Sequence, residues 1–296
     1  MSTMLVKSLA VRSTVLSLLL LIWSASASAS SPQGISIKVF TSPDDQFSVN
    51  SVIAEGDHEV MLVDAQLTKA GAERVLEEID ATKKPLSLIY ITHEHADHFL
   101  GLEVFKRAYP GVTIIATSAV VERINKVYRE KLDKWQKIFG SAASSQIVEI
   151  SKFDGGYFDF DGSRIQVIRD IQGDTDKNTM LWIPGQRVLI AGDVVFDDIH
   201  VYTGETDGNA RANWLNTLWK VRELEPLVVV PGHSKVGAVL DARTAVDFTE
   251  SYLLAFNEEL KTAKDPEGLI DAMKKRFPSA GLLLALERGA KANVIH

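Results

Sequence analysis

The stretch ITHEHADHFLG, residues 91–101, decides how this sequence is interpreted. It places three histidines and an aspartate within six residues, although the whole chain of 296 residues has only seven histidines. Histidine and carboxylate side chains are the ligands that transition metals prefer in sites without thiolates. A polar surface loop would rarely gather so many of them by chance, so the stretch predicts a metal site.

The surroundings of this stretch predict a loop that could hold two metal ions. The apolar run at 87–91 is typical of a buried strand, and residues 99–108 have a helical pattern. In an extended loop, residues i and i+2 point the same way, so His93 and His95 are expected to face one metal. Asp97 and His98 follow one turn later and would face a second point a few ångströms away. The loop therefore predicts half of a two-metal site.

Three further candidate ligands follow predicted strands. Asp193 comes after the apolar run 188–191, His233 after 227–230, and Asp174 shortly after 165–168. Each position alone is weak evidence, because an aspartate or histidine after a strand often only caps a loop. Together with the first motif, the three positions complete a metal site.

The motif order resembles that of the metallo-β-lactamase-fold superfamily. The motifs are HEHADH, GDT, AGD and PGH at 93–98, 173–175, 191–193 and 231–233, within a resemblance that covers about residues 35–237. The resemblance implies an α/β fold, a four-layer αβ/βα sandwich with the metals at one edge. It implies a first metal on His93 and His95 and a second on Asp97, His98 and His233, with Asp193 bridging both.

One position departs from the family pattern. Most members have a histidine in a glycine–histidine–threonine context, where this chain has Gly173-Asp174-Thr175. Aspartate ligates zinc, so Asp174 is expected to complete the first site, and its oxygen donors make iron or manganese more plausible. The alternative is a loop residue beside a first site that is weak or empty. The expected cofactors are two divalent metal ions, with zinc favoured.

The expected chemistry is hydrolysis. Water on a divalent metal ionises near neutral pH, and a hydroxide bridging two metals is a ready nucleophile for a small carbonyl substrate, a β-lactam or a lactone. Asp97 would orient this nucleophile or move its proton. His200 is a second catalytic candidate, because relatives often have a histidine here near the substrate. An ordinary loop histidine is an equal alternative for His200.

Two other functions stay open. Some superfamily members bind a single iron and oxidise persulfides, but they lack several second-site ligands, and Asp97, His98 and His233 are all present here. A non-catalytic metal-binding protein, degenerate at Asp174, is the other alternative. The metal content would separate these two from a binuclear hydrolase.

The first 29 residues are typical of a signal peptide. Lys7 and Arg12 precede an apolar run at 15–23, which is too short to span a bilayer comfortably, and small residues follow. This predicts export to the periplasm or the medium, with residues 30–296 forming one hydrolase domain that needs no membrane. The chain has no cysteine, which excludes disulfides and thiolate ligands. Its net charge of −7 disfavours nucleic acid as a partner and leaves a small-molecule substrate; nothing predicts an oligomeric state.

The remaining pattern predicts two face-to-face sheets with helices outside and additional helices at the C-terminal end. Expected strands include 147–150, and the tryptophans Trp182, Trp214 and Trp219 are expected in the core. Residues 118–139 form a long amphipathic helix with a basic outer face. That face is interpreted as solvated, with Glu130–Lys134 and Asp133–Lys137 ion pairs, or alternatively as a lid over an anionic substrate.

Overall fold

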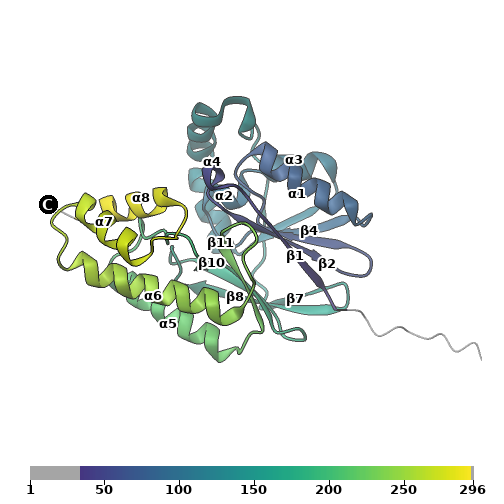
Figure 1. Cartoon of the computed structure of the whole chain (residues 1–296). Coiled ribbons are helices and arrows are strands. Elements are labelled where there is room, and N and C mark those ends of the chain that lie inside the picture. Colours follow the sequence, from purple (N-terminus) through teal and green to yellow (C-terminus); the bar gives the residue numbers. More distant parts are fainter. Residues whose placement is uncertain (1–33, 295–296) are drawn as a thin grey trace, which may run out of the picture. The chain divides into compact units, whose positions relative to one another are not determined.

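The computed structural model describes residues 34–294, so the predicted signal peptide at 1–29 lies outside the described residues. Two β-sheets form its centre (Figure 1). The first has six strands in the order β1-β2-β3-β4-β5-β6. These strands are β1 (Ser36–Thr41), β2 (Asn50–Glu55), β3 (Val60–Val63), β4 (Leu86–Tyr90), β5 (Thr113–Ala116) and β6 (Ser151–Lys152). Strands β3 to β6 run parallel, so the C-terminal ends of β3 and β4 lie at the same edge of the sheet.

The second sheet has five strands in the order β11-β10-β9-β8-β7. The strands are β7 (Tyr157–Phe160), β8 (Ser163–Ile171), β9 (Asn178–Ile183), β10 (Val188–Asp197) and β11 (Val228–Ser234). Strands β10 and β11 pair in parallel, whereas the other pairs are antiparallel. This arrangement again brings two strand ends together at one edge.

The two sheets pack face to face through side chains of both. Val52 and Met61 of the first sheet share a buried cluster with Leu181 and Ile190 of the second. Residues of β2, β3, β9 and β10 are buried throughout or nearly so, which is the pattern of strands covered on both faces.

Helices cover the outer face of each sheet, as Figure 1 shows. The first sheet is covered by α1 (Lys69–Ala81), α3 (Leu102–Ala108) and α4 (Ser118–Phe139), whose apolar residues form one cluster with its strands. The second sheet is covered by α5 (Gly208–Glu223) and α6 (Ala242–Leu260), which are extended by α7 (Pro266–Arg276) and α8 (Leu283–Asn293). The four-layer αβ/βα sandwich with C-terminal helices is therefore confirmed.

Three local predictions were wrong. Residues 147–150 form no strand, and the sheet ends instead with the short β6. The helix expected at 99–108 is divided into α2 (Ala96–Phe99) and α3, because Gly101 N donates to the carbonyl oxygen of Gln66 rather than continuing the helix. Trp219 is 60% exposed and lies outside the core, whereas Trp182 and Trp214 are buried.

Within residues 34–294, no helix is both long enough and apolar enough to cross a bilayer.

Candidate metal centre

The motif of residues 93–98 lies where β4 ends at the sandwich edge. Thr92 and His93 follow β4, His95 precedes the short helix α2, and Asp97 and His98 lie on that helix. Thr92 is held by Asp64, whose carboxylate accepts hydrogen bonds from the Thr92 backbone N–H at 2.9 Å and from its hydroxyl at 2.8 Å. The start of the loop is therefore fixed by the neighbouring strand end.

The first group of candidate ligands combines this loop with the second sheet. It consists of His93, His95, Asp174 and Asp193, whose ligand atoms all lie within 4.8 Å of one another. Nδ1 of His95 is 2.8 Å from Oδ2 of Asp174, and Nε2 of His93 is 3.5 Å from Oδ2 of Asp193. The structure therefore places Asp174, the residue that departs from the family pattern, in the position of a ligand.

The second group consists of Asp97, His98 and His233. Nε2 of His98 lies 3.2 Å from Nε2 of His233. Oδ2 of Asp97 lies 3.8 Å from Nε2 of His98 and 3.5 Å from Nε2 of His233. Two imidazoles and a carboxylate thus converge on one point.

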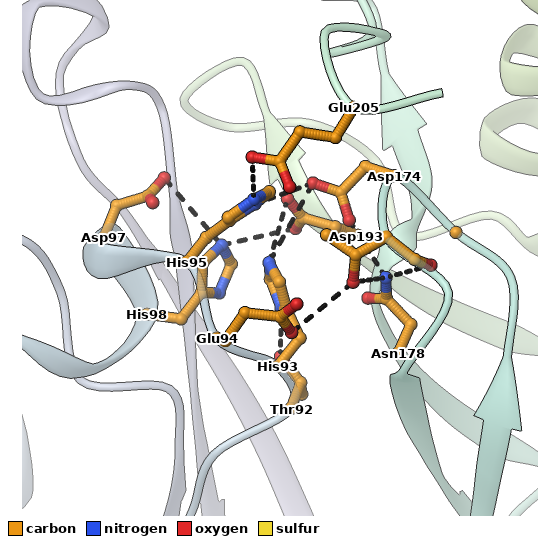
Figure 2. Close-up of polar contacts among 12 residues, drawn as sticks. Thr92, His93, Glu94, His95, Asp97, His98, Asp174, Asn178, Asp193 and Glu205 are labelled. Atoms are coloured by element: carbon orange, nitrogen blue, oxygen red, sulfur yellow. Dashed lines mark hydrogen bonds and ion pairs between the residues drawn. The ribbon is translucent and has the colours of Figure 1, made fainter. Parts of the chain in front are cut away.

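Asp193 connects the two groups. Its carboxylate lies 3.1 Å from Nε2 of His233 and 3.3 Å from Nε2 of His98, in addition to its contact with His93. Figure 2 shows Asp193 and Asp174 approaching from the second sheet, opposite the side chains of the 93–98 loop. One carboxylate between two ligand groups is the geometry expected of a bridging ligand.

Unpaired buried atoms show that the residues present fit a metal. Nε2 of His93, Oδ2 of Asp174 and Oδ1 of Asp193 are buried and lie within ion-pair distance of neighbours, but none of them makes a hydrogen bond of good geometry within the described chain. A buried polar atom without a partner costs about 1–3 kcal/mol, and three of them facing one centre are best explained by a shared ligand. Cations would satisfy these atoms, Nε2 of His93 and Oδ2 of Asp174 in the first group and Oδ1 of Asp193 beside His98 of the second.

Charge interactions in the centre oppose the effect of burial. Burial alone would raise the pKa of Asp193, but His233, His98 and His93 hold it well below its ordinary value. Burial would lower the pKa of His98, but Asp193, Asp64 and Asp97 raise it well above the ordinary value. Without metal, His98 therefore holds its proton more strongly than a free imidazole, and a metal must displace that proton to bind.

Strand geometry brings Asp193 and His233 to the centre. Both residues lie within the observed strands β10 and β11 rather than after them, because these strands run further than the sequence predicted. Gly232 lets the two strands approach: a Cβ atom there would lie 2.0 Å from Oδ1 of Asp193. Any side chain at this position would displace the carboxylate from both ligand groups.

Three residues that orient the ligands were missed in the sequence. Oδ2 of Asp64 is 2.7 Å from Nδ1 of His98, and Nδ2 of Asn178 donates to Oδ1 of Asp174 at 2.9 Å. Oε1 of Glu205 lies 3.1 Å from Nε2 of His95, and this hydrogen bond lowers the pKa of Glu205 to about 2. The one available signal was the position of Asp64, immediately after a strand that runs parallel to β4.

A cavity of about 150 Å³ opens beside the centre. His95, Asp97, Asp193 and His233 line it, together with apolar and cationic residues of α4 and α8. Candidate ligands of both groups therefore face the same space.

The structure does not bring His200 to this cavity. Its Nδ1 lies 3.0 Å from the hydroxyl of Tyr252 on α6, and its side chain is buried. Burial lowers the pKa of His200 to about 4, so the imidazole is neutral at pH 7. This is the environment of an ordinary buried histidine, which was the alternative interpretation of the sequence.

The basic helix α4 differs from its expected role. Among the described residues, neither the Glu130–Lys134 nor the Asp133–Lys137 ion pair forms. Lys131 and Lys134 instead line the cavity next to Trp135. Part of the basic face therefore belongs to the cavity wall.

The chain is similar to known proteins in sequence. The family model of the metallo-beta-lactamase superfamily matches residues 44–233. The exodeoxyribonuclease WalJ of Streptococcus pneumoniae is 36% identical over 91 residues, which cover 30% of this chain and 34% of WalJ. The chain therefore spans about a third of that relative. A type 2 metallo-beta-lactamase of Bacillus sp. (strain 170) is 23% identical over 194 residues, 64% of this chain and 67% of that enzyme.

Solved structures share the fold. A metallo-beta-lactamase family protein from Thermus thermophilus superposes with a TM-score of 0.63 at 22% identity, covering 86% of this chain and 92% of that protein. A beta-lactamase domain protein from Burkholderia ambifaria gives a TM-score of 0.60 at 17% identity, over 87% and 84% of the two chains. At these identities the likeness concerns the fold alone.

Proposed function

Because this chain belongs to the metallo-beta-lactamase superfamily, we propose that it is a hydrolase that needs two divalent metal ions and cleaves a small carbonyl compound, a β-lactam or a lactone. One observation carries this proposal: two groups of candidate ligands face the same cavity and are connected through Asp193. A single-metal protein would have no use for the second group. This argues against the persulfide dioxygenase alternative.

We assign the first metal to His93, His95 and Asp174 and the second to Asp97, His98 and His233, with Asp193 between them. Zinc is the expected ion, since imidazole and carboxylate donors suit it, and Asp174 makes iron or manganese an alternative. Bound divalent ions would supply Lewis acidity, which polarises a carbonyl and lowers the pKa of water.

Two cavity residues would assist the reaction. Asp97 lies at the cavity surface with 15% of its side chain exposed, and the neighbouring His98 and His233 keep its pKa low against the effect of burial. As a carboxylate it would orient a water molecule and accept its proton. Burial raises the pKa of Tyr202, so its hydroxyl stays protonated and would donate a hydrogen bond to the substrate.

The proposed substrate is a small molecule rather than a nucleic acid. Aromatic side chains line the cavity beside the candidate ligands, as is common in sites for small compounds. The net charge of −7 would repel a phosphate backbone. The name of WalJ describes that protein, of which the match covers about a third. The N-terminal pattern supports export to the periplasm or the medium as part of the same proposal.

Metal analysis of the purified protein, followed by hydrolysis of β-lactams, lactones, thioesters and phosphoesters, tests the proposal. We expect two zinc ions per chain and turnover of a β-lactam or lactone. One iron per chain with persulfide oxidation would replace the proposal with the dioxygenase alternative. Substoichiometric metal without turnover would leave a non-catalytic protein.

A variant pair connects the metal to the named residues. His95→Ala should lose metal and activity, because it removes a ligand from the first group. His58→Ala is the matched control, since His58 lies on an exposed turn against Asp161. Full metal content and activity in His95→Ala would refute the assignment.

A further inference from the structure

One wall of the cavity is built by helices at distant points of the sequence. Lys134 and Trp135 come from α4, and Arg288 comes from α8. Helix α8 lies outside residues 44–233, the part that matches the family model. Arg288 therefore cannot be carried over from the family model, whereas Lys134 and Trp135 lie within the matched residues.

An aromatic pair with a cation at each end forms this wall. The rings of Phe47 and Trp135 meet edge to face with centroids 5.4 Å apart. Nζ of Lys134 lies 5.3 Å from the Trp135 ring centre, and Cζ of Arg288 lies 5.6 Å from the Phe47 ring centre. The four side chains thus present an apolar surface flanked by two positive charges.

The two positive charges have no acidic partner. Among the described residues, neither Lys134 nor Arg288 forms an ion pair, and both side chains are exposed. Arg123 on the same helix α4, by contrast, is paired with Glu94 and Asp176. Unpaired cations beside an apolar surface in a cavity are suited to an anionic ligand.

The wall has a fixed position relative to the metal centre. The carbonyl oxygen of Phe47 accepts a hydrogen bond from Nδ1 of His233 at 2.7 Å, while the ring of Phe47 forms the wall. Helix α8 is tied to the loop after β10, since Nδ2 of Asn293 donates to the carbonyl oxygen of Thr203 at 2.9 Å. A ligand on the wall would therefore be held in one orientation to the metals.

We infer that the Lys134–Trp135–Phe47–Arg288 wall binds the carboxylate and apolar body of an amphipathic substrate, away from the bond that is cleaved. This inference rests on the proposed hydrolase function, because it assigns substrate chemistry to the same cavity. The apolar body packs on Phe47 and Trp135, and the carboxylate pairs with the cation at one end of the pair, Lys134 or Arg288. On the side of the cavity opposite the wall, the carboxylates of the ligand groups repel an anionic ligand unless bound metals neutralise their charge.

Binding of two matched probes to the purified, metal-containing protein tests the inference. 4-Phenylbutyrate and 4-phenyl-1-butanol share an apolar body and differ in charge, and titration calorimetry at low salt gives their dissociation constants. We expect the butyrate to bind about three- to tenfold more tightly, with the preference declining as salt is added.

Variants identify the residues responsible. One of the two variants Arg288→Gln and Lys134→Gln should remove most of the preference, with little change in the binding of the alcohol. Lys137→Gln is the matched control, because Lys137 is an exposed lysine of the same helix that does not line the cavity. Equal affinity of the two probes for the unaltered protein would overturn the inference. A preference that persists in both variants would also overturn it, because the carboxylate would then be bound at the metals.

The same preparations separate this inference from the proposed function. Absence of the charge preference in the unaltered protein, together with two metals and normal turnover, would refute the wall alone. An intact preference in a protein without metals or turnover would refute the hydrolase and leave a carboxylate-binding cavity.

Discussion

Oδ2 of Asp64 lies 2.7 Å from Nδ1 of His98, and this contact determines which imidazole nitrogen faces the metal centre. The carboxylate accepts a hydrogen bond from Nδ1–H, so Nε2 is the nitrogen that faces Asp97, Asp193 and His233 and that a metal would bind after displacing its proton. Asp64 is buried and also accepts two hydrogen bonds from Thr92. One side chain therefore orients a candidate ligand and fixes the loop that carries it.

We expect Asp64→Asn to weaken metal binding about 10- to 100-fold, the usual effect of removing a carboxylate behind a ligating histidine. Competition with a chromophoric chelator measures the affinity. Asp161→Asn is the control, because Asp161 also contacts a histidine, the exposed His58, but neither residue belongs to the ligand groups. Unchanged affinity in Asp64→Asn would show that His98 needs no orienting partner or is not a ligand.

Replacement of Asp174 tests the position that departs from the family pattern. Asn178 holds Oδ1 of Asp174, so Oδ2 faces the first group. Asp174→Ala should lower the metal content from two ions to about one, whereas Asp174→His should keep two. Atomic absorption on dialysed protein gives the count, with Asp176→Ala as the control, since Asp176 is 60% exposed and pairs with Arg123. Two ions in Asp174→Ala would exclude it as a ligand.

The buried His200 predicts a pH-dependent loss of stability. Its pKa is about 4 in the folded protein, against an ordinary value of 6.5. Between these values the unfolded chain binds the additional proton, so the free energy of unfolding falls as the pH decreases from 6.5 towards 4. Above pH 6.5 this group contributes no pH dependence.

Urea unfolding at pH 7 and at pH 5 measures this effect. In His200→Leu the loss of unfolding free energy between the two pH values should be smaller than in the unaltered protein. The ligand histidines titrate equally in both proteins, so the difference isolates His200. Identical losses would mean that His200 is already charged when folded, which would contradict its burial next to Tyr252.

The sequence predicted those site residues that are adjacent along the chain or that follow a strand. The loop of residues 93–98 was recognisable because its candidate ligands are adjacent, and Asp193 and His233 because strand ends meet at one sheet edge. Asp64 was not recognised, since its importance depends on the approach of the β3 end to a helix that follows another strand. For the same reason Arg288, which reaches the cavity from a helix more than 150 residues after the motif, could not be placed from the sequence.

Other differences arise from tertiary packing. Tryptophan is usually buried, but Trp219 lies on the solvent-exposed face of α5, whereas Trp214 on the same helix lies in the core. The spacing of α4 predicted intrahelical ion pairs for Lys134, and the cavity beside Trp135 provides a different environment. Amphipathic spacing identifies the buried face of a helix but cannot show what lies beside its edge.

Helix α8 packs closely against the loop around Thr203 at Gly289, and we expect the shape of the cavity to depend on this contact. A Cβ atom at this position would lie 2.2 Å from the hydroxyl oxygen of Thr203, in the loop that carries Tyr202 and Glu205 into the cavity. Gly289→Ala should therefore displace either the loop or the helix. The steric clash should lower the free energy of unfolding by about 1–3 kcal/mol. The higher helix propensity of alanine offsets about 1 kcal/mol of this loss.

The same substitution at Gly208, at the start of α5, is the control, because a Cβ atom there meets open space. Gly208→Ala should leave the free energy of unfolding unchanged or raise it by up to about 1 kcal/mol. For Gly289→Ala we also expect a higher KM at constant metal content, since the wall moves while the ligand groups stay. Urea unfolding and steady-state kinetics give both quantities. A Gly289→Ala protein with unaltered stability and KM would show that α8 moves away from Thr203 without cost, and that its contact with the loop does not shape the cavity.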